Sequence, residues 1–428
     1  MSETITVPEG GRIFNGVKVW DAAWVGVGPL TTRYLADYGA TVVHTETVKN
    51  PDVLRMAGPF RNGVKGIDNS QFFAGFNASK LGLGLNYRAP RGVEIAHRLA
   101  GWADVLVESF SPGVMAKYGL TYEVLSDINP GLIMLSTSMN GQTGPRSKFA
   151  GFGTVMAAQS GFSEVTGWPD RNPGSPYGAY TDFVAQRLCA TALIAALDHK
   201  RRTGEGQFID VSQYEGALQW NAPTMLDYAV NGRVATRMGN RHTSAAPHGI
   251  YPSLPEEGRE RWVAIAVETD EEWQALVELM GRPAWATEPD FATLRARKQN
   301  EDRLDAHIAE WTSQQRNTEV FYLLQPEVAA APVNDARDVI NDPQVRFRQY
   351  LRPLEHPVMG TTLYEGNQAE MSVTPAVMHK AAPCLGENTR AILGDYLGYS
   401  DDEIEALLAD GSAEEYPVPD PFAPPPAA

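Results

Sequence analysis

The chain has 428 residues and a formal net charge of −16, because 52 Asp and Glu residues outnumber 36 Lys and Arg residues. This negative balance argues against nucleic acid or an anionic membrane as a bulk partner. The length favours two domains over a single core. The two cysteines, Cys189 and Cys384, cannot build a disulfide framework or a CxxC metal site.

Several common classes of protein lack their local signatures here. Residues 1–12 have neither the basic nor the apolar region of a signal peptide, and no apolar run reaches the roughly 18–20 residues of a membrane helix. We therefore expect a cytoplasmic protein with no membrane partner. The eight histidines form no pair such as HxxxH, and neither a GxSxG elbow nor a P-loop is present. These absences argue against a metal site, a serine hydrolase and a P-loop NTPase.

The first half of the chain alternates between strand-like and helix-like segments, which is typical of a parallel α/β sheet. Apolar runs predict strands near residues 16–20, 41–45, 104–108, 132–136 and 207–211. Helical periodicity predicts helices near 30–38, 92–100, 151–161, 183–199 and 214–226. Gly26 and Gly28 follow the first strand, but Thr31 stands where a dinucleotide fingerprint needs a third glycine, which disfavours an NAD(P)-linked enzyme.

The character of the chain changes after residue 230. Residues 233–248 are polar and interrupted by glycine and proline, as in a linker, and a strand and helices are predicted between 262 and 324. We therefore expect a small α+β domain with linkers at 231–330, and a large domain formed by 1–230 together with 331–428. The tail from residue 416 has six prolines and no periodicity, which predicts an extended segment.

One acidic residue stands at the start of a long apolar helical pattern. Residues 176–183 read PYGAYTDF and lead directly into it, so Thr181 or Asp182 would occupy the N-cap. The positive end of the helix dipole would keep a carboxylate there ionised and oriented. Such a residue suits an ordinary helix cap and equally a nucleophile, and the local pattern leaves both interpretations open.

A set of cations follows strand or turn signals in the first half of the chain. They are Lys80, Arg88, Lys117, Arg146 and Lys148. In an acidic protein they could form a local site for a phosphorylated, adenine-bearing ligand. The alternative is that they are solvated surface charges.

Five segments, in this order along the chain, carry a resemblance to a known family. They are LADYGATVVHTE (35–46), ADVLVESFSPGVMAKYGL (103–120), NPGLIMLSTSMNGQTGP (129–145), RRTGEGQFIDVSQYEGAL (201–218) and APCLGENT (382–389). Each segment alone is weakly specific for the family, but five of them in the family's order are strong evidence of a resemblance. The chain resembles the class III CoA-transferases, the CaiB/BaiF family, from about residue 11 to about residue 410.

The resemblance implies a fold, an assembly and a set of substrates. The fold is α/β, with a Rossmann-like large domain built from both chain ends and a smaller α+β domain. Two subunits interlock like links of a chain, so a homodimer is expected, and a heteromer is a second possibility. Acyl-CoA and a carboxylic acid are the implied substrates, with coenzyme A handled as substrate and no permanently bound cofactor.

The family nucleophile is an aspartate at the start of a helix, and Asp182 falls on that position. The implied reaction moves CoA from an acyl-CoA to a free acid through an aspartyl mixed anhydride and an aspartyl-CoA thioester. Water must be kept from the anhydride. Some relatives cover it with a glycine-run loop, whereas residues 252–261 here contain only Gly258. The implied shielding therefore has no counterpart in this segment.

The resemblance also implies a CoA site. The residues carried over are Val25, Gly26 and Val27 near the thioester; Thr47, Leu85, Arg88 and Lys117 near the nucleotide; Ser109, Phe110 and Ser111; and Ala150, Gly151 and Phe152 along the pantetheine. The chain departs from the family at three places. Ser109 replaces the usual Asn, His44 replaces Lys, and Ser79-Lys80-Leu81 replaces Asn-Lys-Arg.

Other activities on this fold are less consistent with the residues. A 2-methylacyl-CoA racemase needs a histidine base where Phe152 stands. A non-catalytic subunit of a heteromeric CoA-transferase would lack the aspartate.

One further segment bears on the acceptor acid. The segment 167–173 and the aromatic residues Trp168, Tyr177, Tyr180 and Phe183 resemble members that use succinyl-CoA and aromatic or branched dicarboxylic acids. Core packing would equally explain these aromatic residues.

Overall fold

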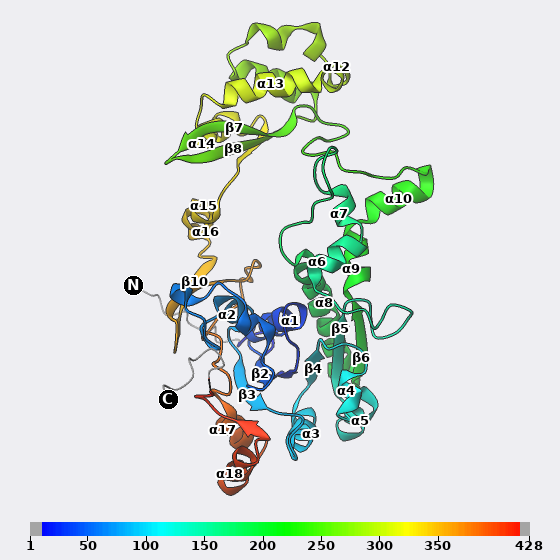
Figure 1. Cartoon of the computed structure of the whole chain (residues 1–428), viewed down its shortest axis with the longest axis vertical. Coiled ribbons are helices and arrows are strands. Elements are labelled where there is room, and N and C mark those ends of the chain that lie inside the picture. Colours follow the sequence, from blue (N-terminus) through cyan, green and yellow to red (C-terminus); the bar gives the residue numbers. More distant parts are fainter. Residues whose placement is uncertain (1–10, 420–428) are drawn as a thin grey trace, which may run out of the picture. The chain divides into compact units, whose positions relative to one another are not determined.

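The computed structural model describes residues 11–419 and divides into two compact units (Figure 1). The described part of unit 1 comprises residues 11–162, 175–234 and 346–419, and unit 2 comprises 163–174 and 235–345. Most of the proline-rich tail, residues 420–428, lies outside the described residues. None of the helices described between residues 11 and 419 is long and apolar enough to cross a membrane.

Unit 1 is built on a mixed, largely parallel sheet. Its strands are β1 (Lys18–Asp21), β2 (Thr41–Glu46), β3 (Leu81–Leu85), β4 (Val105–Glu108), β5 (Ile133–Ser138), β6 (Gln207–Ser212) and β12 (Ala413–Glu414). Their order is β12-β3-β2-β1-β4-β5-β6, with all pairs parallel except β12 against β3. The direction of winding reverses between β1 and β4, which is where doubly wound sheets bind ligands beyond the carboxyl ends of their strands.

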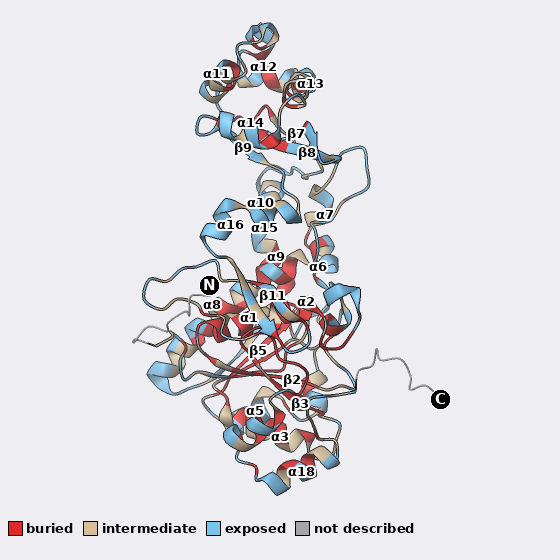
Figure 2. Ribbon diagram, turned by 90° about the vertical axis from the view of Figure 1, so that its left-hand side faces the viewer, coloured by how far each residue is buried: buried red, intermediate tan, exposed pale blue. Residues whose placement is uncertain are grey.

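Helices cover both faces of this sheet (Figure 2). On one face lie α1 (Val27–Asp37) and α8 (Tyr180–Thr203), and on the other lie α3 (Gly92–Trp102), α5 (Tyr122–Ile128) and α18 (Asp401–Ala409). Side chains of β4 alternate between the two cores, with Val105 and Val107 in one and Leu106 in the other. Burial on both faces explains why the sequence of β4 is a nearly continuous apolar run.

Further helices and a hairpin complete unit 1. They are α2 (Gln71–Asn77), α4 (Val114–Lys117), α6 (Gly153–Gln159), α7 (Phe162–Val165, which crosses into unit 2), α9 (Gln213–Trp220), α10 (Ala222–Asn231), the hairpin β10 (Leu351–His356) and β11 (Gly360–Glu365), and α17 (Thr389–Ala391). The single helix predicted at 214–226 is two helices, because Asn221 ends α9 and begins α10.

Unit 2 packs helices on a three-stranded antiparallel sheet, β7 (His248–Glu256), β8 (Arg259–Ala266) and β9 (Ala329–Pro332). Its helices are α11 (Asp270–Leu279), α12 (Leu294–Gln299), α13 (Glu301–Thr312), α14 (Asn317–Leu324) and α15 (Ala336–Asn341), and α16 (Pro343–Phe347) crosses its boundary. Trp273, Phe291 and Leu304 lie in its core.

The predicted boundaries of the small domain differ from those of unit 2. The unit extends to residue 345 because β9 pairs with β8, and because Arg261 on β8 forms an ion pair with Asp338 on α15 at 2.7 Å. Residues 163–174 also belong to it, and the Gly239 N–H donates to the Gly167 carbonyl at 2.9 Å. These contacts join segments distant in sequence, which composition does not reveal.

Candidate active site

Two loops meet at the point where the sheet changes winding direction. The loop Trp24–Gly26 follows β1, and Ser109 and Phe110 follow β4. The Ser109 Oγ accepts a hydrogen bond from the Trp24 N–H at 2.9 Å and donates one to the Trp24 carbonyl at 3.0 Å. The rings of Trp24 and Phe110 meet edge to face, with centroids 5.3 Å apart. Val25, Gly26, Ser109 and Phe110, predicted from separate motifs, are thus brought together.

Asp182 lies in the first turn of α8 and is 7% exposed. The N-cap of α8 is Ala179 and no side chain caps it, so the prediction that Thr181 or Asp182 is the cap is wrong. The Thr181 Oγ1 instead donates to the Gly153 carbonyl at 3.1 Å and so joins the starts of α8 and α6. The Asp182 carboxyl is therefore not used as a helix cap.

Two glycines flank the Asp182 carboxyl. A Cβ added to Gly26 would lie 2.8 Å from the Asp182 Oδ2, and one added to Gly153 would lie 2.8 Å from the Oδ1. Gly26 is the N-cap of α1 and Gly153 is the first residue of α6, and neither helix has a side-chain cap. The first N–H groups of a helix have no intrahelical partner. Backbone donors of this kind can stabilise an oxyanion that forms on or beside a carboxylate.

Burial dominates the acidity of this carboxyl. It raises the pKa of Asp182 from an ordinary 3.8 to about 7, and no described cation or hydrogen-bond donor offsets it. The rise corresponds to about 4 kcal/mol against the ionised form, whereas a helix N-terminus favours an anion by only about 0.3–1 kcal/mol. Burial therefore opposes the ionised form of Asp182 more strongly than the helix start favours it, which is the opposite direction to the one expected from the sequence. Carboxyls with such perturbed acidity cluster at functional sites.

The residues predicted to hold the nucleotide are in different environments. Arg88 and Lys117 are exposed, and the Arg88 Nε donates to the hydroxyl of Tyr118, the residue after Lys117, at 3.4 Å. The Thr47 hydroxyl donates to the Glu414 carboxylate at 2.9 Å. The Leu85 side chain is 1% exposed and belongs to the core, so it presents no surface to a nucleotide.

The segment predicted to line the pantetheine leads directly into α6. Phe152 is the N-cap of this helix, and Ala150 and Phe152 are exposed while Gly151 is half-buried. A cavity of about 300 Å³ lies beside Ala150 and Lys148. Val27 is buried in α1 and its side chain is in the core, so only the backbone of this residue faces the site.

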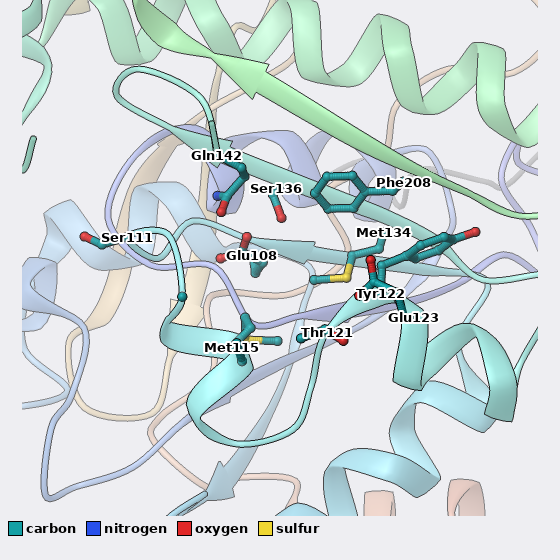
Figure 3. Close-up of a pocket in the computed structure, with 12 residues that line it drawn as sticks. Glu108, Ser111, Met115, Thr121, Tyr122, Glu123, Met134, Ser136, Gln142 and Phe208 are labelled. Carbon is teal, nitrogen blue, oxygen red and sulfur yellow. The ribbon is translucent and has the colours of Figure 1, made fainter. Parts of the chain in front are cut away.

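A second cavity, of about 250 Å³, is lined by Glu108 and Ser111, the residues on either side of Ser109 and Phe110 (Figure 3). Glu108 at the end of β4 and Ser136 on β5 lie inside it, between Met115 and Phe208, and Ser111 lies at its edge. The Glu108 carboxylate accepts from the Phe110 N–H at 2.7 Å. Burial raises the pKa of Glu108 to about 7. This carboxyl supports the back of the loop that carries Phe110.

Buried charges connect the strands below the site. The Asp21 carboxylate accepts a hydrogen bond from Lys80 at 2.7 Å and contacts the His44 ring at 3.0 Å. The other side of the His44 ring faces Glu46, which forms an ion pair with Arg55 at 2.7 Å. Burial opposes the charge on His44, yet Asp21 and Glu46 raise the pKa of His44 to about 9. Lys80 is fully buried, so the prediction that it could bind a phosphorylated ligand is wrong.

Sequence reasoning missed three parts of the site. Gly153 touches the candidate nucleophile, Asp52 hydrogen-bonds to the Val25 N–H at 2.8 Å, and Glu108 supports the loop beside them. The only signal in the sequence is that Asp52 follows Pro51 shortly after a strand, a pattern that ordinary turns share. Between residues 11 and 419, no group of three His, Cys, Asp or Glu side chains could hold a metal ion.

Known proteins share both the sequence pattern and the fold. The model of the family described as "CoA-transferase family III" matches residues 14–389. A succinyl-CoA–D-citramalate CoA-transferase of Chloroflexus aurantiacus is 31% identical over 93% of this chain and 97% of its own length. The β subunit of a succinyl-CoA–L-malate CoA-transferase of the same organism is 31% identical over 92% of this chain and 96% of its own.

The solved structures agree with this assignment. A crystal structure of a CaiB/BaiF family protein from Brucella suis matches with a TM-score of 0.81 and 30% identity, over 90% of this chain and all of that one. The match includes the α/β fold with its large, mostly parallel sheet, and the family model spans the loops and the aspartate described above. The chain belongs to CoA-transferase family III and is a CoA-transferase that uses acyl-CoA substrates.

Proposed function

We propose that the protein moves CoA from an acyl-CoA donor to a free carboxylic acid through covalent intermediates on Asp182. The observation that carries this proposal is the position of the Asp182 carboxyl, buried between the backbones of Gly26 and Gly153 at the winding reversal of the sheet. The absence of side chains at the two glycines lets their backbones lie close to both carboxyl oxygens, and the uncapped starts of α1 and α6 are at these same glycines.

The reaction consists of four acyl transfers that balance without an added proton. An Asp182 oxygen attacks the donor thioester, the C–S bond breaks, and CoA leaves as a thiolate from a mixed anhydride. The thiolate attacks the Asp182 carbonyl, and the donor acid leaves as a carboxylate. The acceptor carboxylate then attacks the aspartyl-CoA thioester and again releases the thiolate. Attack of the thiolate on the acceptor carbonyl forms the new acyl-CoA and regenerates Asp182.

Trapping the intermediates tests this assignment. Hydroxylamine added during turnover should convert Asp182 to a hydroxamate, located by mass spectrometry of the peptide. Asp182→Ala should lose both the hydroxamate and CoA transfer, and Asp198→Ala, an exposed carboxylate of the same helix, should lose neither. Full transfer by Asp182→Ala would refute the mechanism. Exchange of an α-proton in deuterated water, without CoA transfer, would instead support a racemase.

The acceptor class follows from the relatives and from the surroundings of the aspartate. Two relatives carry succinyl-CoA in their names, with citramalate and malate as the acids. Of the aromatic residues noted in the sequence, Tyr177 is fully exposed and packs in no core. Phe183, the residue after Asp182, packs its ring against that of Phe76 at 5.9 Å, and Tyr180 packs against Phe162 at 5.3 Å, so both rings have partners within the protein. We therefore favour succinyl-CoA and a short or branched dicarboxylic acid over an aromatic acid.

A substrate panel separates these acceptors. Succinyl-CoA and acetyl-CoA would each be offered with citramalate, malate and an arylacetic acid, and the new thioester identified by mass spectrometry. We expect the highest kcat/KM for succinyl-CoA with one of the dicarboxylic acids. A preference for the arylacetic acid would overturn the proposed acceptor.

The assembly is proposed from the family resemblance. An interlocked homodimer should have twice the chain mass by light scattering and should not exchange subunits without unfolding. Activity of the protein purified alone supports a homomer, whereas a requirement for a second, different chain supports the heteromeric alternative that the name of one relative indicates.

A further inference from the structure

One residue beside the candidate nucleophile has a backbone conformation that its side chain disfavours. Val25 has φ +70°, in the left-handed region. A β-branched residue is strained there, by about 1–3 kcal/mol, and such strain persists only where neighbouring groups hold it. Val25 precedes Gly26, and the position of the Gly26 backbone depends on this turn. The strain is therefore located one residue from the contact with the Asp182 carboxyl.

A fully buried carboxylate holds this turn. The Asp52 Oδ2 accepts from the Val25 N–H at 2.8 Å, and its Oδ1 accepts from the Leu54 N–H at 2.9 Å and so caps the 3₁₀ turn Val53–Met56. Two backbone donors thus use both oxygens of the side chain. Asparagine would offer one acceptor and would turn its NH₂ toward the other donor.

Asp52 is itself held in place by a contact with Glu46. Its backbone N–H donates to the Glu46 Oε1 at 3.1 Å, and Glu46 is fixed by Arg55, which also pairs with Asp68 at 2.7 Å. The charges in the buried chain balance, with the carboxylates Asp21, Glu46 and Asp68 facing the cations Lys80, His44 and Arg55. Asp52 therefore has a rigid support on one side and a strained turn on the other.

We propose that Asp52 is a positioning residue: its hydrogen bond to the Val25 N–H holds Val25 in the left-handed conformation and thereby holds the Gly26 backbone against the Asp182 carboxyl. Asp52 does not touch the reacting atoms and acts through Val25 and Gly26. This inference rests on the proposed function, because it assigns Asp52 a task in catalysis by Asp182.

A double-mutant cycle tests the assignment, because glycine adopts φ +70° without strain. Asp52→Asn should lower kcat about tenfold to a hundredfold, as expected for the loss of one buried hydrogen bond together with release of the turn. In a Val25→Gly background, the same substitution should lower kcat by less than about threefold relative to Val25→Gly alone. A purely structural role for Asp52 would give the same loss in both backgrounds.

A matched variant controls for local unfolding. The Ser70 hydroxyl shares its proton between the carbonyls of Leu54 and Ala57, at 2.8 and 2.7 Å, and also caps α2, so Ser70→Ala weakens the same 3₁₀ turn and its surroundings without touching Val25. It should lower the melting temperature and leave kcat unchanged. If Asp52→Asn does not fold, Asp52→Ser replaces it and has the same expected result, because serine can still cap Leu54 but cannot also reach Val25.

The outcomes separate the two proposals. Transfer by Asp182→Asn at the wild-type rate would refute the proposed function. With Asp182→Asn inactive, an unchanged kcat for Asp52→Asn, or an equal loss in both Val25 backgrounds, would overturn the role of Asp52 alone. A loss that Val25→Gly rescues supports it.

Discussion

Asp182→Asn should stabilise the folded protein at alkaline pH while abolishing CoA transfer. In the wild type, burial raises the pKa of Asp182 from 3.8 to about 7. Between these two values the folded protein binds more protons than the unfolded chain, so its free energy of unfolding falls as the pH rises. The loss is complete above pH 7 and amounts to about 4 kcal/mol, of which about 2–3 kcal/mol falls between pH 5 and pH 8.

Asparagine is nearly isosteric and does not ionise, so this loss should be absent from the variant. Its buried amide forgoes hydrogen bonds with water, at a cost of about 1–3 kcal/mol that does not depend on pH. The variant should therefore be close to the wild type, or slightly less stable, at pH 5, and should gain about 2–3 kcal/mol on it by pH 8.

Urea unfolding at several pH values between 5 and 8, followed by circular dichroism, measures this difference. Asp198→Asn is the matched control, because Asp198 is an exposed carboxyl of the same helix whose pKa Arg201 and Arg202 lower. It should show no gain at high pH. Parallel stability curves for the wild type and Asp182→Asn would refute the claim that burial governs this carboxyl.

Three further results are expected. The kcat/KM for acyl-CoA should fall about tenfold for each pH unit below 7, because only ionised Asp182 attacks; a flat profile from pH 5.5 to 8 would contradict this. Gly153→Ala should lower kcat at least about a hundredfold, because its Cβ would lie 2.8 Å from the Asp182 Oδ1. Gly101→Ala is the control and should transfer CoA normally, because its Cβ would lie at an ordinary 3.7 Å from the Ile128 side chain. Lys80→Met should lower the free energy of unfolding by about 3–5 kcal/mol, because it leaves the Asp21 carboxylate with one buried cation fewer. Adding Asp21→Asn should recover part of this loss. The absence of any recovery would contradict the pairing of Lys80 with Asp21.

Strands β4 and β5 were predictable because burial on both faces gives each of them a mostly apolar run. β3 was missed because its sequence, LGLGL, has no β-branched residue. Its glycines are required by close packing, since a Cβ on Gly84 would lie 2.2 Å from the Glu414 carbonyl oxygen. Local pattern cannot anticipate a contact between residues more than three hundred positions apart.

The residues of the candidate site could be named from the sequence, whereas the electrostatics of that site could not. Asp182 and the Val25–Gly26 loop were predicted from the family pattern, and in the structure the Gly26 backbone lies against the Asp182 carboxyl. The acidity of Asp182 depends on what surrounds it in three dimensions, so a helix start alone suggested the opposite direction. Lys80 was expected at a ligand because its partner Asp21 lies 59 positions away. Charge pairs of this separation appear only after folding.

The short strand β12 has a consequence for how the chain is made. It closes the β3 edge of the sheet with residues 413 and 414, and the Glu414 carboxylate binds the Thr47 hydroxyl and the Val48 N–H. During synthesis, β3 leaves the ribosome more than three hundred residues before this partner. Its edge stays open for that interval and could pair with another nascent chain. Most of unit 2 is continuous in sequence and is synthesised before β12. We therefore expect unit 2 to fold while the edge of β3 is still unpaired.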